Sequence, residues 1–240
     1  MIRFINGNHL TISNQTATHS HVADRLDSEL LKFISTHAAT PGDRVPPLDV
    51  LSRELGLSVT KLREQLEVAR QLGLVEVRPR SGIKSVEYNF LPAIRQSLLF
   101  GLALNANLFQ AYGELRNHTE AGFFKEAVAR LTTADRQQLR SLVAAAQEKL
   151  QGHPVRIPHQ EHRQLHIGMF RRLENPFVIG LLEAYWEAYE AVELNVFSDY
   201  KYLERVWDYH ARIVECICAE RLDEGLELLV EHAQLLRDRV

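Results

Sequence analysis

Four histidines in the second half of this 240-residue sequence have the spacing and surroundings of metal ligands. His162 and His166 are four residues apart in HQEHRQLHIGMF, so on a helix both imidazoles lie on one face, about one turn apart. His210 and His232 each lie within an apolar, helix-periodic stretch, VWDYHARIVECI and LLVEHAQLL. Buried imidazoles need partners, and one metal ion would satisfy all four rings at once. We therefore predict a metal site formed by His162, His166, His210 and His232.

Two other interpretations of these histidines stay open. The rings can be purely structural, either solvated or hydrogen-bonded to neighbours, as many histidine pairs at this spacing are. Alternatively, a metal with an open position can activate water, as in a metal-dependent hydrolase or lyase. Glu161 supplies no obvious general base, because on a helix it faces about 100° away from His162. His159 shares the face of His162 and is a fallback ligand.

The chain around these histidines is predicted to be helical almost throughout. Apolar residues recur at helical spacing, and the strand signature is absent. Breaks fall at Thr132-Thr133, Gly152-His153-Pro154, Asn175-Pro176 and Arg221-Leu222-Asp223, with Thr133 as the expected cap of the helix that follows it. The predicted bundle has six or seven helices, near residues 92–104, 106–131, 133–151, 158–173, 176–198, 200–220 and 222–239.

The N-terminal part of the chain has the pattern of a winged helix-turn-helix. A helical stripe over residues 22–36 precedes a helix that contains Leu51 and is ended by Gly56. Ser58 is placed to cap a second helix, and a hairpin follows. The fold class is therefore mainly α, with a small β-hairpin wing. We expect a flexible arm over 1–19, the winged domain over 20–87, a linker over 88–94 and the helical domain over 95–240.

The second helix and the hairpin carry a local excess of positive charge. Between Val59 and Lys84 there are six basic and three acidic side chains, in a chain of net charge −3. Such a patch suits phosphate neutralisation, and polar residues leading the second helix suit insertion into a DNA major groove. The alternative is a small helical hairpin with solvated charges. The predicted DNA-binding residues are Thr60, Lys61, Arg63, Arg78, Arg80 and Gly82.

Composition indicates where in the cell the protein is expected. No apolar run approaches the roughly 20 residues that span a bilayer, and the N-terminus lacks the apolar core of a secretory signal. Cys216 and Cys218 are two apart and form no plausible disulfide, which fits a reducing cytosol. We expect a cytoplasmic protein without membrane association.

The segment from about residue 20 to 86 resembles the winged helix-turn-helix of the GntR superfamily of bacterial regulators. The matching residues include Pro41-Gly42-Asp43-Arg44, Leu55-Gly56-Leu57-Ser58, Leu62-Arg63-Glu64 and Gly73-Leu74-Val75. Val59 stands where the family usually has Arg. The resemblance implies a homodimer that places two winged domains on a palindromic operator in double-stranded DNA, and by default a repressor rather than an enzyme.

Residues 95–236 resemble the FCD ligand-binding domain of the FadR subfamily. The resemblance rests on the spacing of His166, His210 and His232, with His162 where the family usually has Asp. Four neutral imidazoles favour Zn²⁺ or Ni²⁺ over hard cations, which prefer oxygen. Arg116 lies where the family has an arginine near the effector pocket, so the resemblance implies that it binds a small carboxylate effector. A salt bridge with Glu120 is the alternative role for Arg116.

Overall fold

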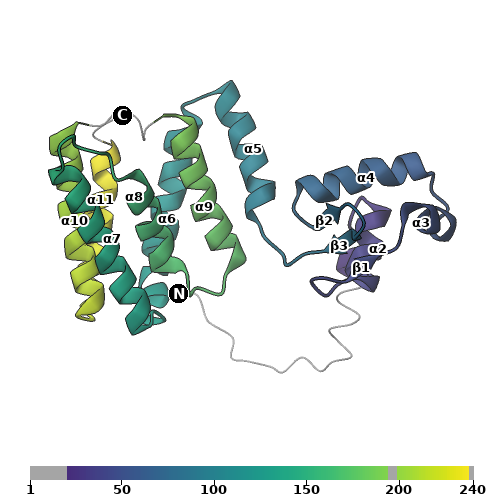
Figure 1. The fold of residues 1–240 in the computed structure, drawn as a ribbon, viewed down its shortest axis with the longest axis horizontal. Coiled ribbons are helices and arrows are strands. Elements are labelled where there is room, and N and C mark those ends of the chain that lie inside the picture. Colours follow the sequence, from purple (N-terminus) through teal and green to yellow (C-terminus); the bar gives the residue numbers. More distant parts are fainter. Residues whose placement is uncertain (1–20, 194–198, 238–240) are drawn as a thin grey trace, which may run out of the picture. The chain divides into compact units, whose positions relative to one another are not determined.

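The computed structural model describes residues 21–193 and 199–237, and the chain divides into two compact units between Asn89 and Phe90 (Figure 1). Each unit is described by itself. The arm expected over residues 1–19 lies outside the described residues.

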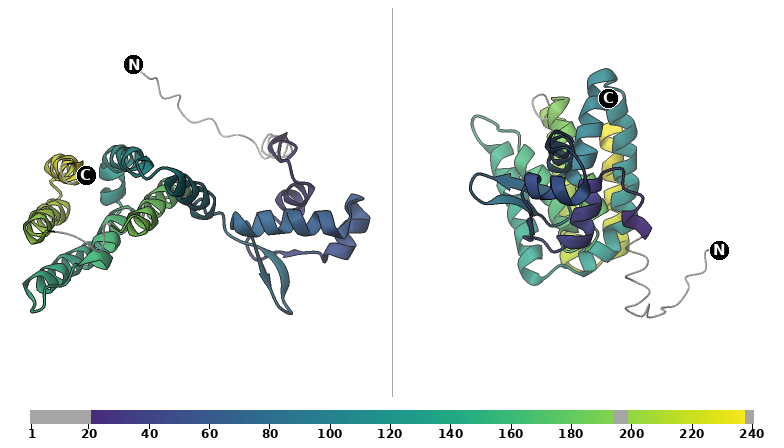
Figure 2. Two further views of the ribbon diagram at one scale, coloured as in Figure 1. Left: turned by 90° about the horizontal axis from the view of Figure 1, so that it is seen from above. Right: turned by 90° about the vertical axis from the view of Figure 1, so that its right-hand side faces the viewer.

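The first unit combines three helices with a small antiparallel sheet. Strand order is β1-β3-β2, and the register pairs Val45 with Ile83 and Arg78 with Gly82. The β2–β3 hairpin forms a narrow projection from this unit (left view of Figure 2). The elements of the unit are α2 (Glu29–His37), β1 (Arg44–Val45), α3 (Leu48–Leu55), α4 (Val59–Gln71), β2 (Val75–Arg78) and β3 (Gly82–Ser85).

The turn between α3 and α4 forms as the sequence predicts. Gly56 adopts φ = 67°, a left-handed conformation that suits glycine and ends α3. The Ser58 hydroxyl accepts a hydrogen bond from the Lys61 amide at 3.1 Å and caps α4. The winged helix-turn-helix prediction is therefore confirmed at the level of the fold.

Two features of this unit differ from the prediction. The helix expected over 22–36 is interrupted, because residues 21–23 are helical but α2 begins only at Glu29, after the Ser28 cap. The strand β1 was not predicted, since two residues are too few to show alternation. The Gln65 side chain holds the start of α2 against α4, accepting hydrogen bonds from the Leu30 amide and the Ser28 hydroxyl at 2.9 and 3.1 Å.

The second unit is a helical bundle, as predicted (Figure 1). Helix α8 packs against α6, α7 and α9, while α10 packs against α7 and α11. Its core includes Phe124, Leu165, Met169, Trp207 and Ile213, all buried. The helices are α5 (Leu91–Leu104), α6 (Leu108–Ala129), α7 (Thr133–Gln151), α8 (His159–Phe170), α9 (Pro176–Ala191), α10 (Tyr200–Cys218) and α11 (Leu222–Arg237).

The helix starts follow from local chemistry, with one correction. Asn175 caps α9, with Pro176 in its first turn. The cap of α7 is Thr132, not Thr133, because Thr132 and Asp135 form a capping box in which each side chain accepts the other's backbone amide. Helix α5 begins at Leu91, inside the linker expected over 88–94. Among the described residues, no helix is both long and apolar enough to cross a membrane.

Candidate metal centre and nucleic-acid interface

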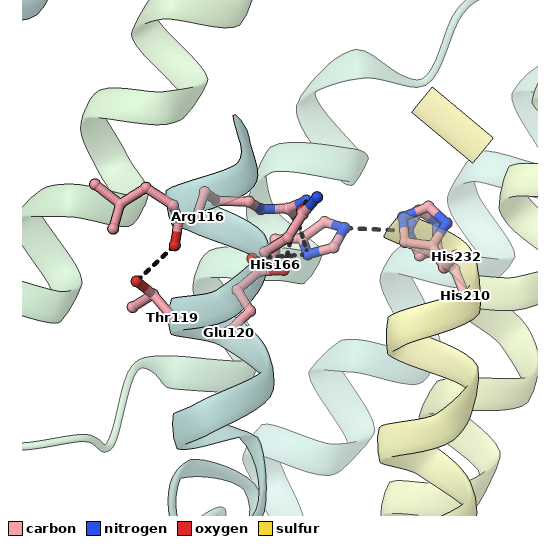
Figure 3. Close-up of polar contacts among 8 residues, drawn as sticks. Arg116, Thr119, Glu120, His166, His210 and His232 are labelled. Atoms are coloured by element: carbon pink, nitrogen blue, oxygen red, sulfur yellow. Dashed lines mark hydrogen bonds and ion pairs between the residues drawn. The ribbon is translucent and has the colours of Figure 1, made fainter. Parts of the chain in front are cut away.

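Three helices of the bundle bring the four predicted histidines together. His162 and His166 come from α8, His210 from α10 and His232 from α11. Four ring nitrogens, one from each residue, all lie within 4.8 Å of one another. The Nε2 atom of His210 is 3.2 Å from Nε2 of His166 and 3.1 Å from Nε2 of His232 (Figure 3). The four rings therefore converge on one point inside the bundle.

These separations fit nitrogens that share one ion. Zinc binds histidine nitrogen at roughly 2.0–2.1 Å in tetrahedral geometry, which places neighbouring nitrogens about 3.3 Å apart. Burial is the main reason why the pKa of all four rings lies well below the ordinary value, and neighbouring positive groups lower it further. The rings are therefore neutral near pH 7, the form that binds a metal.

An ion pair on α6 orients one of these rings. Glu120 Oε1 lies 3.1 Å from Nδ1 of His166, and Arg116 Nη2 lies 2.9 Å from Glu120 Oε2 (Figure 3). Arg116 Nη2 is also 2.7 Å from Nδ1 of His166. Burial raises the pKa of the Glu120 carboxyl, and the Arg116 guanidinium opposes that rise. The Arg116–Glu120 salt bridge, the alternative role considered for Arg116, is thus formed.

Nδ1 of His166 lies beside both a donor and an acceptor. A guanidinium only donates hydrogen bonds, so Nδ1 accepts from Arg116 at 2.7 Å when it carries no proton. When Nδ1 carries the proton, it donates to Glu120 Oε1 at 3.1 Å and leaves the lone pair of Nε2 to bind an ion. A carboxylate behind a metal-binding histidine is the usual outer-shell arrangement.

Several ring nitrogens in the cluster lack a hydrogen-bond partner. Within the described part of the chain, Nε2 of His162 and Nδ1 of His210 and His232 are buried without a hydrogen-bond partner. An ion that bound Nε2 of His162 would remove the first of these deficits. The donor set, its neutral charge state and its geometry therefore fit a divalent transition metal such as Zn²⁺ or Ni²⁺.

Aromatic side chains surround the cluster and enclose a small cavity. Its volume is about 20 Å³. Tyr202 of α10 was not predicted to lie here, because no local signal in the sequence distinguishes it. Trp207 packs on the ring of His210, with centroids 4.8 Å apart. The cavity is lined by Arg116, His162, Tyr185, Trp186, Tyr189, Tyr202, His232 and Ala233.

Two residues considered for other roles at this site lie elsewhere. His159, the fallback ligand, stacks on Tyr189 and places Nε2 2.9 Å from Glu190, so it is not one of the four converging rings. Glu161 is paired with Lys149 of α7 at 2.6 Å. The hydrolase hypothesis therefore gains no general base from Glu161.

The predicted DNA-binding residues of α4 lie on its exposed face. Leu62 and Ala69 are fully buried in the core of the first unit, whereas Thr60, Lys61 and Arg63 are exposed. Lys61 forms an ion pair with Glu64 at 3.2 Å. Arg63 has no ion pair among the described residues, so its guanidinium is accessible to a phosphate or a base edge.

The β2–β3 hairpin carries the remaining predicted DNA-binding residues. Arg78, Arg80 and Gly82 are exposed at its tip. Arg80 has φ = 65°, an uncommon left-handed conformation for a residue with a side chain. Arg78 is paired with Glu76 at 2.8 Å on the same strand. The hairpin thus presents two arginines where a wing would follow a phosphate backbone.

Comparison with known proteins identifies the family of the helical domain. Residues 112–235 match the FCD domain family, which is more than half of the chain. The chain belongs to the FCD domain family. The match includes Arg116, Glu120 and all four clustered histidines of the FCD domain. No curated protein matches the sequence.

Two solved structures are similar to this chain over most of its length. The chain is similar to Streptococcus agalactiae GntR, with 19% sequence identity and a TM-score of 0.64 over 92% of this chain and 100% of that chain. It is also similar to E. coli McbR/YncC, with 18% identity and a TM-score of 0.48 over 94% and 98% of the two chains. The fold is therefore similar to that of Streptococcus agalactiae GntR, and the predicted FCD domain is confirmed by the family match.

Proposed function

We propose that this protein is a DNA-binding transcription regulator whose operator affinity is controlled at the metal-containing pocket of its FCD domain. The observation that carries the proposal is the division of α4 into two faces. One face is buried in the core of the first unit, and the other presents Thr60, Lys61 and Arg63 to solvent. This is the disposition required of a helix that lies in a major groove.

The four histidines are the residues that would hold the ion in the FCD domain. A bound ion supplies a buried positive charge and joins three helices. Glu120 orients His166, and Arg116 neutralises Glu120, so this chain contributes an outer shell as well as ligands. Any signal at this pocket must favour one arrangement of the protein over another to change its affinity for DNA.

The remaining parts of the proposal come from the family resemblance. The protein acts as a homodimer, and each chain contacts one half-site of a palindromic operator. It acts as a repressor by default. The small carboxylate effector expected at Arg116 stays a prediction.

A matched pair of arginine variants tests the DNA-binding role. The DNA probe is a duplex selected from a random library by the purified protein, and binding is measured by fluorescence anisotropy. Arg63→Ala removes an exposed guanidinium from α4 and weakens binding by about tenfold or more, the usual effect of losing a base or phosphate contact. Arg140→Ala removes an exposed guanidinium from α7 and leaves binding unchanged.

Circular dichroism and size-exclusion chromatography show whether both variants keep the fold and the oligomeric state. If the two variants bind the duplex with equal affinity, the hypothesis that α4 lies in the major groove is wrong. Failure of the selection to return any duplex would overturn the DNA-binding proposal as a whole.

A further inference from the structure

The room beside the histidine cluster limits what this pocket can recognise. The cavity there measures about 20 Å³. A buried water needs roughly 10–15 Å³, whereas sites for organic ligands are commonly on the order of 300–1,000 Å³. The pocket as folded thus accepts about one water-sized group. A dicarboxylate or a larger acid does not fit without moving several aromatic side chains.

Both terminal nitrogens of the arginine expected to bind an organic acid are already engaged, although its buried Nε has no hydrogen-bond partner among the described residues. Arg116 Nη2 is 2.9 Å from Glu120, Nη1 donates to Asn117 at 3.1 Å, and the guanidinium lies over the ring of Tyr185. Both side chains of the Arg116–Glu120 pair are almost fully buried. An incoming carboxylate would displace Glu120 and leave a buried charge unpaired, at a substantial cost in free energy.

The number of protein ligands also argues against an organic ligand on the ion. Four protein ligands complete the tetrahedral shell of a closed zinc site, whereas sites that bind exogenous ligands keep a position open. Here four imidazoles already converge.

We propose that the divalent transition-metal ion is itself the regulatory signal, so that the FCD domain of this protein is a metal sensor. This inference rests on the proposed DNA-binding function and names the ligand that controls it. The pocket recognises the ion through four neutral imidazoles, and no organic effector is needed.

The ligand helices explain how ion binding reaches the rest of the domain. The rings come from α8, α10 and α11, and α8 also packs against α6, α7 and α9. Without an ion, these helices meet at a cluster of buried nitrogens that are only partly satisfied. Ion binding gives Nε2 of His162 a partner and joins the three helices through the ion. Loaded and ion-free forms therefore differ in the stability and packing of the bundle.

A larger cleft on the other side of α8 is the competing place for an organic ligand. Its volume is about 510 Å³, and it is lined by residues of α7, α8 and α9. Its two arginines are already paired, Arg163 with Glu190 and Arg171 with Asp135, each at 3.4 Å. An organic acid acting there would not need the histidines, which gives the experiment a way to separate the two sites.

The test uses the full-length protein, freed of metal with a chelator, and a duplex selected by it from a random library. Zn²⁺ or Ni²⁺ alone is expected to change the Kd for that duplex by about fivefold or more, the lower range of allosteric coupling. Addition of acetate, malonate or citrate to the loaded protein is expected to cause no further change. The ion is also expected to raise the melting temperature.

Two variants assign the response to the cluster. His166→Ala combined with His210→Ala is expected to lose the ion-dependent change in Kd and in melting temperature. His118→Ala, an exposed histidine on α6 outside the cluster, keeps both responses. If the double variant does not fold, His162→Gln serves instead, because it is a single change of similar size that removes the imidazole nitrogen expected to bind the ion.

The possible results distinguish metal sensing from the DNA-binding function on which it depends. A selected duplex bound equally tightly with and without the ion would overturn metal sensing while leaving the proposed DNA-binding function in place. A response that appears only when a carboxylate is added, or that persists in the histidine variants, would also overturn it. If the protein selects no duplex, the proposed function and this inference fail together.

Discussion

Arg116 and Glu120 form a buried ion pair one turn apart on α6, and an exposed pair at the same spacing joins Glu126, near the end of that helix, to its C-cap residue Arg130. The N–O distance is 2.9 Å in both pairs. The side chains of the first pair are 6% and 2% exposed, whereas those of the second are 43% and 52% exposed. Burial is thus the main difference between the two pairs, which makes them a natural comparison.

Glu120→Gln is expected to destabilise the protein much more than Glu126→Gln. The first change leaves the Arg116 charge buried without a counter-charge, at a cost of about 3–5 kcal/mol in the free energy of unfolding. The second removes an exposed pair, and such pairs contribute about 1 kcal/mol or less. Denaturant unfolding of the two ion-free variants at pH 7 measures both values. Small and equal losses would mean that burial already keeps Glu120 protonated.

At the scale of elements, the contact between α9 and the start of α5 depends on one glycine. A Cβ at Gly180 would lie 2.8 Å from the Leu91 amide nitrogen and 3.0 Å from Cβ of Phe90. Backbone atoms cannot yield as a flexible side chain can, so α5 approaches α9 this closely only because residue 180 has no side chain.

Gly180→Ala is therefore expected to lower the free energy of unfolding by about 1–3 kcal/mol, the usual cost of overpacking. Gly122→Ala on α6 is the control, because its Cβ would meet no atom within 4 Å. There the better helix propensity of alanine stabilises by up to about 1 kcal/mol. Thermal unfolding of both variants should show shifts of opposite sign. Shifts of the same sign would contradict the packing argument.

The sequence predicted most of these elements because their signals are local. Helical periodicity indicated every helix of the bundle, with bounds within a few residues except at the end of α9, which was expected at 198 and lies at Ala191. Glycine and serine placed the turn before α4. The Thr132 cap was missed although its signal was present, since Asp135 stands three residues later, as a capping box requires. The strand β1 was missed because its pairing with β3 joins residues about 40 positions apart.

The candidate site was predictable only in its ligands. Two histidines shared a helix face, and two more lay in apolar helices, so convergence could be inferred. The contact between Glu120 and His166 joins residues 46 positions apart, and no local pattern announces it. The cavity volume depends on how Tyr185, Trp186 and Tyr189 pack, which spacing alone does not determine.

At the scale of the whole molecule, charge is unevenly shared between the two units. Residues 1–90 hold 11 basic and 10 acidic side chains, and residues 91–240 hold 17 and 21. The excess of positive charge on α4 and the β2–β3 hairpin therefore belongs to a chain that is acidic overall. A local patch of this kind is sufficient for phosphate binding, because screening confines its effect to nearby groups.

Binding to the selected duplex is accordingly expected to weaken steeply as salt rises, because phosphate contacts release counterions. Arg80→Asn removes one wing charge and suits the left-handed backbone at that position. It should reduce the slope of log K against log salt by about 1 for each chain bound. Anisotropy titrations across a series of NaCl concentrations measure the slope. A flat response, or an unchanged slope in the variant, would exclude the wing from the phosphate backbone.

The histidine cluster is assembled from stretches of chain 44 and 22 residues apart, so an unfolded chain does not present it. An ion that binds only the native form stabilises it by mass action, by about 2.7 kcal/mol when the free ion is at 100 times its Kd. Proteases remove chains that unfold more often, so the turnover of the protein would follow the metal supply of the cell. Scarcity of the ion would then have two effects: it would change the affinity of each molecule for DNA, and it would lower the number of molecules in the cell.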